Sequence, residues 1–197
     1  MELTTCRPGG LELTRLGLAT CQFPPAARLC DIGCGAGATV ALLTSLGYQA
    51  IGVDLLPSES SVQADAAALP FDDNSFDGML FECSFSKIAA PKQALSEAHR
   101  VLKPNGKLLI SDFYARGQPA MFSGVLGRME SQIVILQRLQ SAGFRVIIWQ
   151  DHSETLPQFW GQWILDQGSQ QVWRAIDRTT LQQAKCGYFL AVWEEKS

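Results

Sequence analysis

The sequence predicts an α/β fold with a mostly parallel sheet, and three observations support this class. Residues 29–38 follow the pattern of a buried strand that breaks into a glycine-rich turn and continues as a helix over 38–46. Apolar runs of strand length recur at 50–53, 76–81 and 107–112, and an amphipathic helix is expected at 91–102. With 47% hydrophobic and 18% charged residues, 197 residues can bury one sizeable core, so we expect a single domain over 1–197.

The glycine-rich turn is the first candidate binding feature. Asp31 ends the strand, and Gly33, Gly35 and Gly37 follow within six residues of it. Glycines leave no Cβ between the backbone and a ligand, and the helix that starts after them presents free amide groups. The stretch therefore predicts a cradle for a nucleotide or nucleoside.

An acid beyond the turn leaves two nucleotide classes open. Asp54 ends the next apolar run, where a carboxylate can accept hydrogen bonds from both hydroxyls of a ribose. The spacing of Gly33 and Gly35 with Ala38 also fits a loose dinucleotide fingerprint. Because both classes use a ribose-binding acid, an NAD-dependent oxidoreductase remains an alternative at this point.

Several motifs together resemble the class I S-adenosylmethionine-dependent methyltransferases. They are the glycine motif 31–37, the acid Asp54, the pair Asp65–Ala66, the fourth-strand motif 76–81 and the helix-to-strand motif 99–108. The resemblance implies a Rossmann-like sheet of seven mostly parallel strands, with helices on both faces. Its last strand, 186–193, is expected to run antiparallel between strands five and six. A dinucleotide enzyme gives residues 65–71 no role, which disfavours NAD.

The resemblance also implies the cofactor, S-adenosyl-L-methionine, and its contacts. Asp31 and the glycines would hold the methionyl end, Asp54 the ribose and Leu55 one adenine face. Glu82 and Cys83, after the fourth strand, are pocket candidates, although strand-end capping and simple packing explain them equally well. The expected cofactor-binding residues are Asp31, Gly33, Cys34, Gly35, Gly37, Asp54, Leu55, Asp65, Ala66, Glu82 and Cys83.

The acceptor side is less well defined by the sequence. Asp112 and Tyr114 follow the fifth strand and are candidates for a base or orienting group in an in-line SN2 methyl transfer, with His152 a weaker candidate. This strand ending is similar to that of bacterial arsenite-methyltransferase-like enzymes. Cys83 and Cys186, with Cys6, could therefore bind a soft metalloid through their thiols, and the alternative is that they are inert reduced thiols. No metal site is expected.

Two segments flank the predicted cofactor-binding core, 28–150. A helix is expected within 1–25, and the resemblance implies that it lies over the cofactor, so Arg7 either meets the methionine carboxylate or is simply solvated. Residues 152–185, between strands six and seven, are expected to form a helical insertion that leaves from the ligand edge. Its helical stripe, which includes three tryptophans, favours a lid that packs on the domain over direct substrate contact.

The connection 55–60 departs from the family pattern. A parallel crossover normally needs about a dozen residues, usually with a helix. We therefore expect the helix here to be absent or reduced to one turn, which leaves a thinly covered sheet face that a partner subunit, as in a homodimer, would close. A short connection would also loosen the wall of the adenine pocket. An alternative is therefore a non-catalytic S-adenosylmethionine-binding protein with a regulatory or assembly role.

Charge and hydropathy limit the classes of partner that this protein is expected to bind. The net charge of −3, without a long basic tract, argues against nucleic acid, and the absence of a long apolar run argues against a membrane span. The N-terminus lacks the pattern of a secretory signal, so we expect a cytoplasmic protein with a small-molecule substrate.

Overall fold

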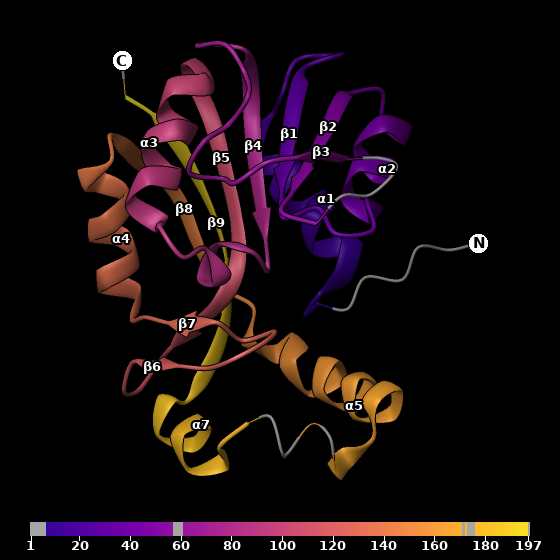
Figure 1. The fold of residues 1–197 in the computed structure, drawn as a ribbon, viewed down its shortest axis with the longest axis vertical. Coiled ribbons are helices and arrows are strands. Elements are labelled where there is room, and N and C mark those ends of the chain that lie inside the picture. Colours follow the sequence, from indigo (N-terminus) through magenta and orange to yellow (C-terminus); the bar gives the residue numbers. More distant parts are fainter. Residues whose placement is uncertain (1–6, 57–60, 171, 173–175, 197) are drawn as a thin grey trace.

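A computed structural model describes residues 7–56, 61–170, 172 and 176–196. The chain forms a seven-stranded sheet in the order β3-β2-β1-β4-β5-β9-β8 (Figure 1). The first five strands in this order, β3, β2, β1, β4 and β5, run parallel. Strand β9 runs antiparallel to both β5 and β8, so the predicted sheet is confirmed. The strands are β1 (Arg28–Ile32), β2 (Gln49–Asp54), β3 (Ser61–Gln63), β4 (Phe76–Glu82), β5 (Leu102–Ala115), β8 (Phe144–Asp151) and β9 (Cys186–Glu195).

Helices cover both faces of this sheet. On one face, α3 (Pro91–Val101) and α4 (Gln132–Ser141) bury Leu95 and Leu139. On the other face, α1 (Gly10–Cys21) and α2 (Ala38–Ser45) bury Leu18 and Leu43. The central strands are therefore buried on both sides, which explains why they appear in the sequence as continuous apolar runs.

Helix α1 lies within residues 1–25 and packs on the sheet through small as well as large residues. Leu16 is 42% exposed, whereas Thr14 and Gly17 are buried. A Cβ at Gly17 would lie 2.3 Å from Cδ1 of Leu109 on β5. The helix therefore turns its smallest residue toward the sheet so that the two backbones can approach closely.

The insertion after β8 lies beyond the carboxyl ends of the parallel strands (Figure 1). It contains the short 3-10 helix η2 (Ser153–Thr155), α5 (Leu156–Gln167) and α7 (Arg178–Ala184), so a helical insertion is confirmed. Phe159 of α5 packs on Phe113 of β5 with ring centroids 5.7 Å apart. Trp173, part of the predicted stripe, lies outside the described residues.

Two features differ from the sequence-based prediction. Strand β5 begins at Leu102, directly after α3, and continues to Ala115, beyond the predicted 107–112. Between β5 and α4, a two-stranded antiparallel sheet of β6 (Ala120–Met121) and β7 (Arg128–Met129) was not predicted. Strands of two residues are too short for an alternation of side chains to be recognised in the sequence.

The short connection after β2 is only partly described. Six residues separate Asp54 from Ser61, and the side chains of Leu55 and Leu56 are 63% and 76% exposed. The predicted single helical turn falls on residues 57–60, which lie outside the described residues. The thin covering of this face and a partner subunit there stay predictions.

No helix in the described part of the chain combines the length and the apolar character that crossing a membrane requires.

Candidate cofactor and acceptor site

The glycine turn leaves the carboxyl end of β1 open to a ligand. Gly33, Gly35 and Gly37 have φ angles of 75°, 52° and 81°. A Cβ at Gly33 would lie 2.6 Å from Cβ of Ser84, whereas a Cβ at Gly35 would meet nothing within 4 Å. The turn is therefore tightly packed on its inner side and open where a ligand can approach the backbone.

Asp54 lies against this turn, as the ribose-acid prediction requires. One carboxylate oxygen accepts a hydrogen bond from the amide of Gly35 at 2.9 Å, and the other accepts one from the amide of Leu56 at 3.0 Å. Each carboxylate oxygen has two lone pairs, so Asp54 keeps acceptor capacity for a further donor. Its role toward a ribose stays a prediction.

The ends of β1 and β4 place two carboxylates in the interior. Asp31 and Glu82 are only 3% and 6% exposed. Burial, and next to it the charge of Glu82, raise the pKa of Asp31, while Arg7 opposes the shift. This arrangement favours a cation, because a positive charge in contact with both carboxylates would relieve their repulsion.

Glu82 is held by a buried network that sequence reasoning missed. It accepts hydrogen bonds from Arg7 at 2.8 Å, from Thr14 on α1 at 2.7 Å and from Thr39 on α2 at 2.7 Å. Arg7 also donates to both threonine hydroxyls. Arg7 is therefore not solvated: it joins the N-terminal segment to β4, α1 and α2, and a contact with a methionine carboxylate stays a prediction.

The residues predicted to lie beside the adenine follow β3. The amide of Ala64 donates to the carbonyl of Asp54 at 3.0 Å, which joins this segment to the predicted ribose acid. Asp65 accepts a hydrogen bond from the amide of Ala67 at 2.9 Å, and Ala66 is buried. The exposed Leu55 side chain is free to cover a ligand at this edge.

The two described cysteines weighed for metalloid capture, Cys83 and Cys186, are separated by β5. The five described cysteines are free, and no group of three metal-ligating side chains is found among the described residues. Cys83 directly follows β4 and Cys186 begins β9, with β5 between these strands, while Cys6 lies outside the described residues. Burial raises the pKa of Cys34 to about 11 and that of Cys186 to about 12, so both are thiols at neutral pH.

Asp112 is engaged inside the protein. Its carboxylate accepts hydrogen bonds from the backbone amide of Ser86 at 2.7 Å, from the hydroxyl of Ser86 at 2.9 Å and from the amide of Phe113. Burial raises its pKa above the usual range. These bonds join β5 to the segment after β4, which is a bracing role.

Tyr114 and His152 have internal partners as well. The hydroxyl of Tyr114 donates to Asp151 at 2.6 Å, and burial together with this carboxylate raises the pKa of Tyr114 to about 12. Tyr114 also packs in the core formed with α3 and α4, on the opposite face from α1 and α5. The ring nitrogens of His152 lie 3.1 Å from Glu154 and 3.4 Å from Gln150.

An aromatic wall lies on the α1 and α5 face instead. Phe113 packs against Tyr188 and Phe159, with ring centroids 5.1 Å and 5.7 Å away. Trp160 and Trp163 extend this group along α5. The Tyr188 hydroxyl donates to the hydroxyl of Ser111 at 3.3 Å. No sequence motif identified Tyr188, because an aromatic residue inside a strand is usually part of the core.

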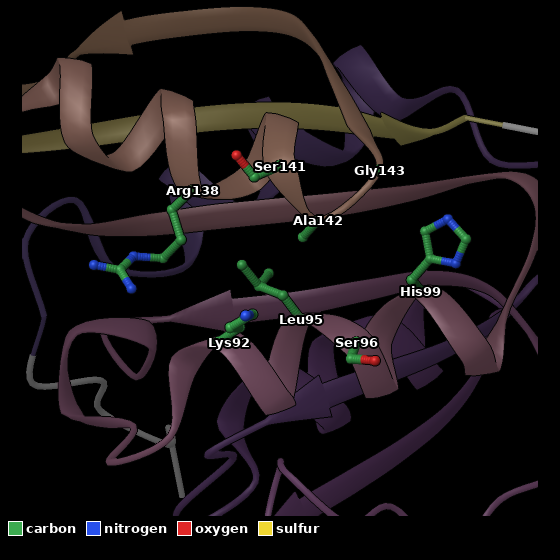
Figure 2. A pocket seen from close by; sticks show the side chains of 8 residues that line it. All are labelled: Lys92, Leu95, Ser96, His99, Arg138, Ser141, Ala142 and Gly143. Atoms are coloured by element: carbon green, nitrogen blue, oxygen red, sulfur yellow. The ribbon is translucent and has the colours of Figure 1, made fainter.

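A surface groove lies elsewhere, between α3 and α4 (Figure 2). It measures about 450 Å³, and its basic side chains include His99 and Arg138, which pair with Glu195 and Glu130. It contains none of the predicted site residues. Its lining residues are Lys92, Leu95, Ser96, His99, Arg138, Ser141, Ala142 and Gly143.

The fold and the glycine turn define a nucleotide-binding α/β protein of the methyltransferase type. Residues 30–110 match a family model described as a methyltransferase domain. Over these residues the chain is similar to the class I S-adenosylmethionine-dependent methyltransferases. A demethylmenaquinone methyltransferase of Renibacterium salmoninarum is 37% identical over 100 residues, which is 45% of this chain and 42% of that protein. The chain spans about half the length of the curated relatives it matches.

Solved structures agree on the fold. Phosphoethanolamine N-methyltransferase 2 of Haemonchus contortus, in complex with S-adenosyl-L-methionine, matches with a TM-score of 0.74 and 18% identity over 99% of this chain and 55% of that one. The cyclase SpnF matches with a TM-score of 0.75 and 22% identity over 94% of this chain and 80% of that one. A protein described as a cyclase thus shares this fold, so the fold alone does not decide the reaction.

Proposed function

We propose that this protein transfers the methyl group of S-adenosylmethionine to a small apolar acceptor. The observation that carries this proposal is the grouping, at one sheet edge, of the open glycine turn, Asp54 and the two buried carboxylates. Arg7 pairs with Glu82, and its charge only partly opposes the raised pKa of Asp31, so the two carboxylates still favour further positive charge. S-Adenosylmethionine carries two cationic groups, a sulfonium and an ammonium, and therefore suits this environment.

The residues at this edge fit the cofactor piece by piece. The backbone around Gly35 is open, and Asp54 beside it has acceptor capacity for ribose hydroxyls. Asp31 would hold the methionyl ammonium, and Asp65 with Ala66 would contact the adenine edge. When bound, the cofactor supplies an electrophilic methyl group on its sulfonium.

The chain's own contribution is positioning. An in-line SN2 transfer needs an acceptor held opposite the leaving sulfur, and correct orientation alone can supply about 7–11 kcal/mol. The half-buried rings of Trp160 and Trp163, which pack on the buried Phe159, would hold and desolvate the acceptor. The insertion would then act as a lid over the ligand edge.

The same wall indicates the acceptor's chemistry. Trp160 and Trp163 keep part of their flat apolar surface exposed, which suits a planar aromatic ring. Relatives with the name demethylmenaquinone methyltransferase support the same class of substrate. A hydroxylated aromatic ring, such as a reduced naphthoquinone, is therefore the proposed acceptor.

A binding protein without transfer is the second candidate, for a specific reason. Both acceptor-side candidates in the sequence, Asp112 and Tyr114, are engaged in internal hydrogen bonds. If transfer needs a base, neither side chain offers a free one. Such a protein would bind S-adenosylmethionine and act as a regulatory or assembly partner.

Calorimetric titration with S-adenosylmethionine, S-adenosylhomocysteine and NAD tests the cofactor. We expect binding of the first two and none of NAD. Incubation with methyl-labelled S-adenosylmethionine and demethylmenaquinol, catechol, dithiothreitol or arsenite then tests transfer. A labelled organic product supports the proposal, whereas binding without any product supports the non-catalytic alternative.

A further inference from the structure

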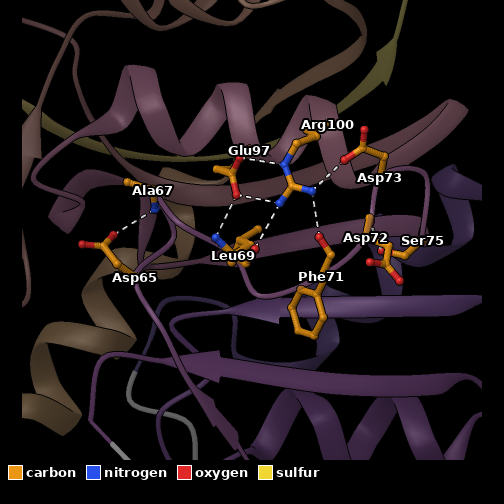
Figure 3. A network of polar contacts seen from close by, with 9 residues as sticks. All are labelled: Asp65, Ala67, Leu69, Phe71, Asp72, Asp73, Ser75, Glu97 and Arg100. Atoms are coloured by element: carbon orange, nitrogen blue, oxygen red, sulfur yellow. Dashed lines mark hydrogen bonds and ion pairs between the residues drawn. The ribbon is translucent and has the colours of Figure 1, made fainter.

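Arg100, in the helix-to-strand motif, joins Glu97 on its own helix to residues 69–73 (Figure 3). Its Nε and Nη2 donate to Glu97 at 2.8 Å each, and Nη2 also donates to the carbonyl of Leu69 at 3.0 Å. Its Nη1 donates to the carbonyl of Phe71 at 2.7 Å and to Asp73 at 2.8 Å. All five N–H donors of the side chain therefore have an acceptor.

Glu97 completes the bracing from the other side. While it accepts both bonds from Arg100, it also accepts the backbone amide of Leu69 at 2.8 Å. The end of α3 also holds the far end of this segment, because the carbonyls of Arg100 and Val101 accept hydrogen bonds from the amides of Asn74 and Ser75. Helix α3 thus holds both ends of residues 69–75.

This braced segment continues directly from the adenine-side residues. Ala66 and Leu69 are buried in the same core, and the amide of Ala68 donates to the carbonyl of Asp65 at 2.9 Å. Only two residues separate Ala66 from Leu69, the first residue held by Glu97 and Arg100. A shift at Leu69 must therefore move the backbone that faces the ligand.

We propose that Arg100 and Glu97 are positioning residues that set the selectivity of the site for adenine. This inference rests on the proposed function, in which Asp65 and Ala66 contact the adenine edge. A rigid backbone rejects a base whose donors and acceptors are reversed, because its own polar groups would be left unpaired. A loosened backbone adapts to either base and loses that discrimination.

The test compares two nucleosides by calorimetry: S-adenosylhomocysteine and S-inosylhomocysteine, which carries a 6-oxo group in place of the 6-amino group. The wild-type protein is expected to prefer the adenine form by about tenfold or more. In Arg100→Lys the preference should fall below about threefold, because an ammonium group cannot replace the planar fork. The same change at Arg145, in a surface ion pair with Glu194 on the far side of the sheet, should leave the preference unchanged.

Thermal unfolding of each variant separates positioning from stability. If Arg100 only stabilises the fold, both nucleosides lose affinity equally and the ratio stays as in the wild type, which overturns this inference alone. Should Arg100→Lys fail to fold, Asp73→Ala removes one acceptor of Arg100 at a residue whose side chain is 69% exposed, and an intermediate preference is then expected. A wild-type protein that binds both nucleosides equally refutes the inference, and one that binds neither refutes the proposed function with it.

Discussion

The edge of the sheet where ligands are expected has two different regions. Around the glycine turn it is polar, and its buried polar side chains come from five separate parts of the chain. Beyond β5 it is aromatic. On the cofactor side, Arg7, Thr14 and Thr39 all donate to the buried Glu82. On the acceptor side, Phe113 and Phe159 meet ring against ring. The first arrangement suits one charged ligand, and the second tolerates apolar ligands of several shapes.

The difference teaches where binding energy and specificity reside in this fold. Hydrogen-bonded carboxylates impose fixed directions, so the cofactor side accepts little variation in its ligand. Apolar contacts are non-directional and roughly proportional to buried area, so the acceptor side can change with a few side chains. Perturbing each side should therefore produce different kinds of loss.

The largest effect is expected at Glu82. Replacing Glu82 with Ala leaves the guanidinium of Arg7, whose side chain is 11% exposed, without its carboxylate and leaves two threonine hydroxyls without an acceptor. The free energy of unfolding should fall by about 3–5 kcal/mol, measured by urea denaturation. The matched control is Glu12→Gln, because Glu12 pairs with Arg15 on the exposed surface of α1 and should change stability by less than about 0.5 kcal/mol. Equal effects of the two changes would show that the Glu82 network is not a buried one.

Asp54 should give the next largest effect, on affinity instead of folding. Asp54→Ala removes a charged acceptor beside Gly35, so binding of S-adenosylhomocysteine should weaken by about 1.5–3 kcal/mol in a calorimetric titration. Asp166, an exposed acid on α5, serves as the control, and its replacement with Ala should leave the affinity unchanged. Unchanged affinity in Asp54→Ala would contradict the ribose role.

These two sites also show how far sequence reasoning reaches. The sheet, its antiparallel last strand and the position of Asp54 could be predicted, because buried strands have apolar runs and ligands gather where those runs end. Thr14 and Thr39 could not be predicted, since a threonine among apolar helix positions gives no indication that its hydroxyl meets a buried carboxylate. The contacts of Arg100 were equally hidden, because three of its acceptors are a carboxylate and carbonyls about 30 residues away in sequence.

The acceptor side was harder to predict for a different reason. Asp112 and Tyr114 have the residue types expected of a base or orienting group, but alternation along β5 sends Tyr114 to the α3 and α4 face. The residues that face α5 are Phe113 and its aromatic neighbours, which composition alone cannot distinguish from core. The orientation of a strand-end residue depends on register, and the sequence shows register only where one face is polar.

A smaller effect is expected on the aromatic side. Trp163 stacks on Phe159 with ring centroids 5.8 Å apart, and Trp163→Ala should lower kcat/KM for the acceptor by about tenfold, or about 1.4 kcal/mol. Affinity for S-adenosylhomocysteine should not change. Leu165→Ala provides the control on the same helix, because Leu165 is 79% exposed. If Trp163→Ala weakened both ligands equally, the insertion would be part of the structural core instead of a lid.

The smallest effect concerns Tyr114, and its pH dependence distinguishes a brace from a base. Tyr114→Phe removes the 2.6 Å bond to Asp151 and should lower the free energy of unfolding by about 0.5–1.5 kcal/mol at pH 7. Tyr48→Phe is a suitable control, since the ring of Tyr48 packs edge-on against Phe23 in a partly buried position. Turnover should stay unchanged, because a phenol whose pKa is raised to about 12 is not ionised at neutral pH.

The sign of the pH effect follows from the partner of Tyr114. Burial raises the pKa of Asp151, but hydrogen bonds from Ser153 and Tyr114 outweigh burial and hold this pKa below its ordinary value of 3.8. A lowered pKa means that this stabilisation is complete above the ordinary value and disappears as the pH falls through the lower, folded-state pKa. The ordinary pKa values of Asp and Tyr are about 4 and 10. The difference in free energy of unfolding between wild type and Tyr114→Phe should therefore be constant from about pH 5 to 9. It should become smaller in acid. A turnover rate that falls strongly in Tyr114→Phe without loss of stability would instead restore Tyr114 as the catalytic base.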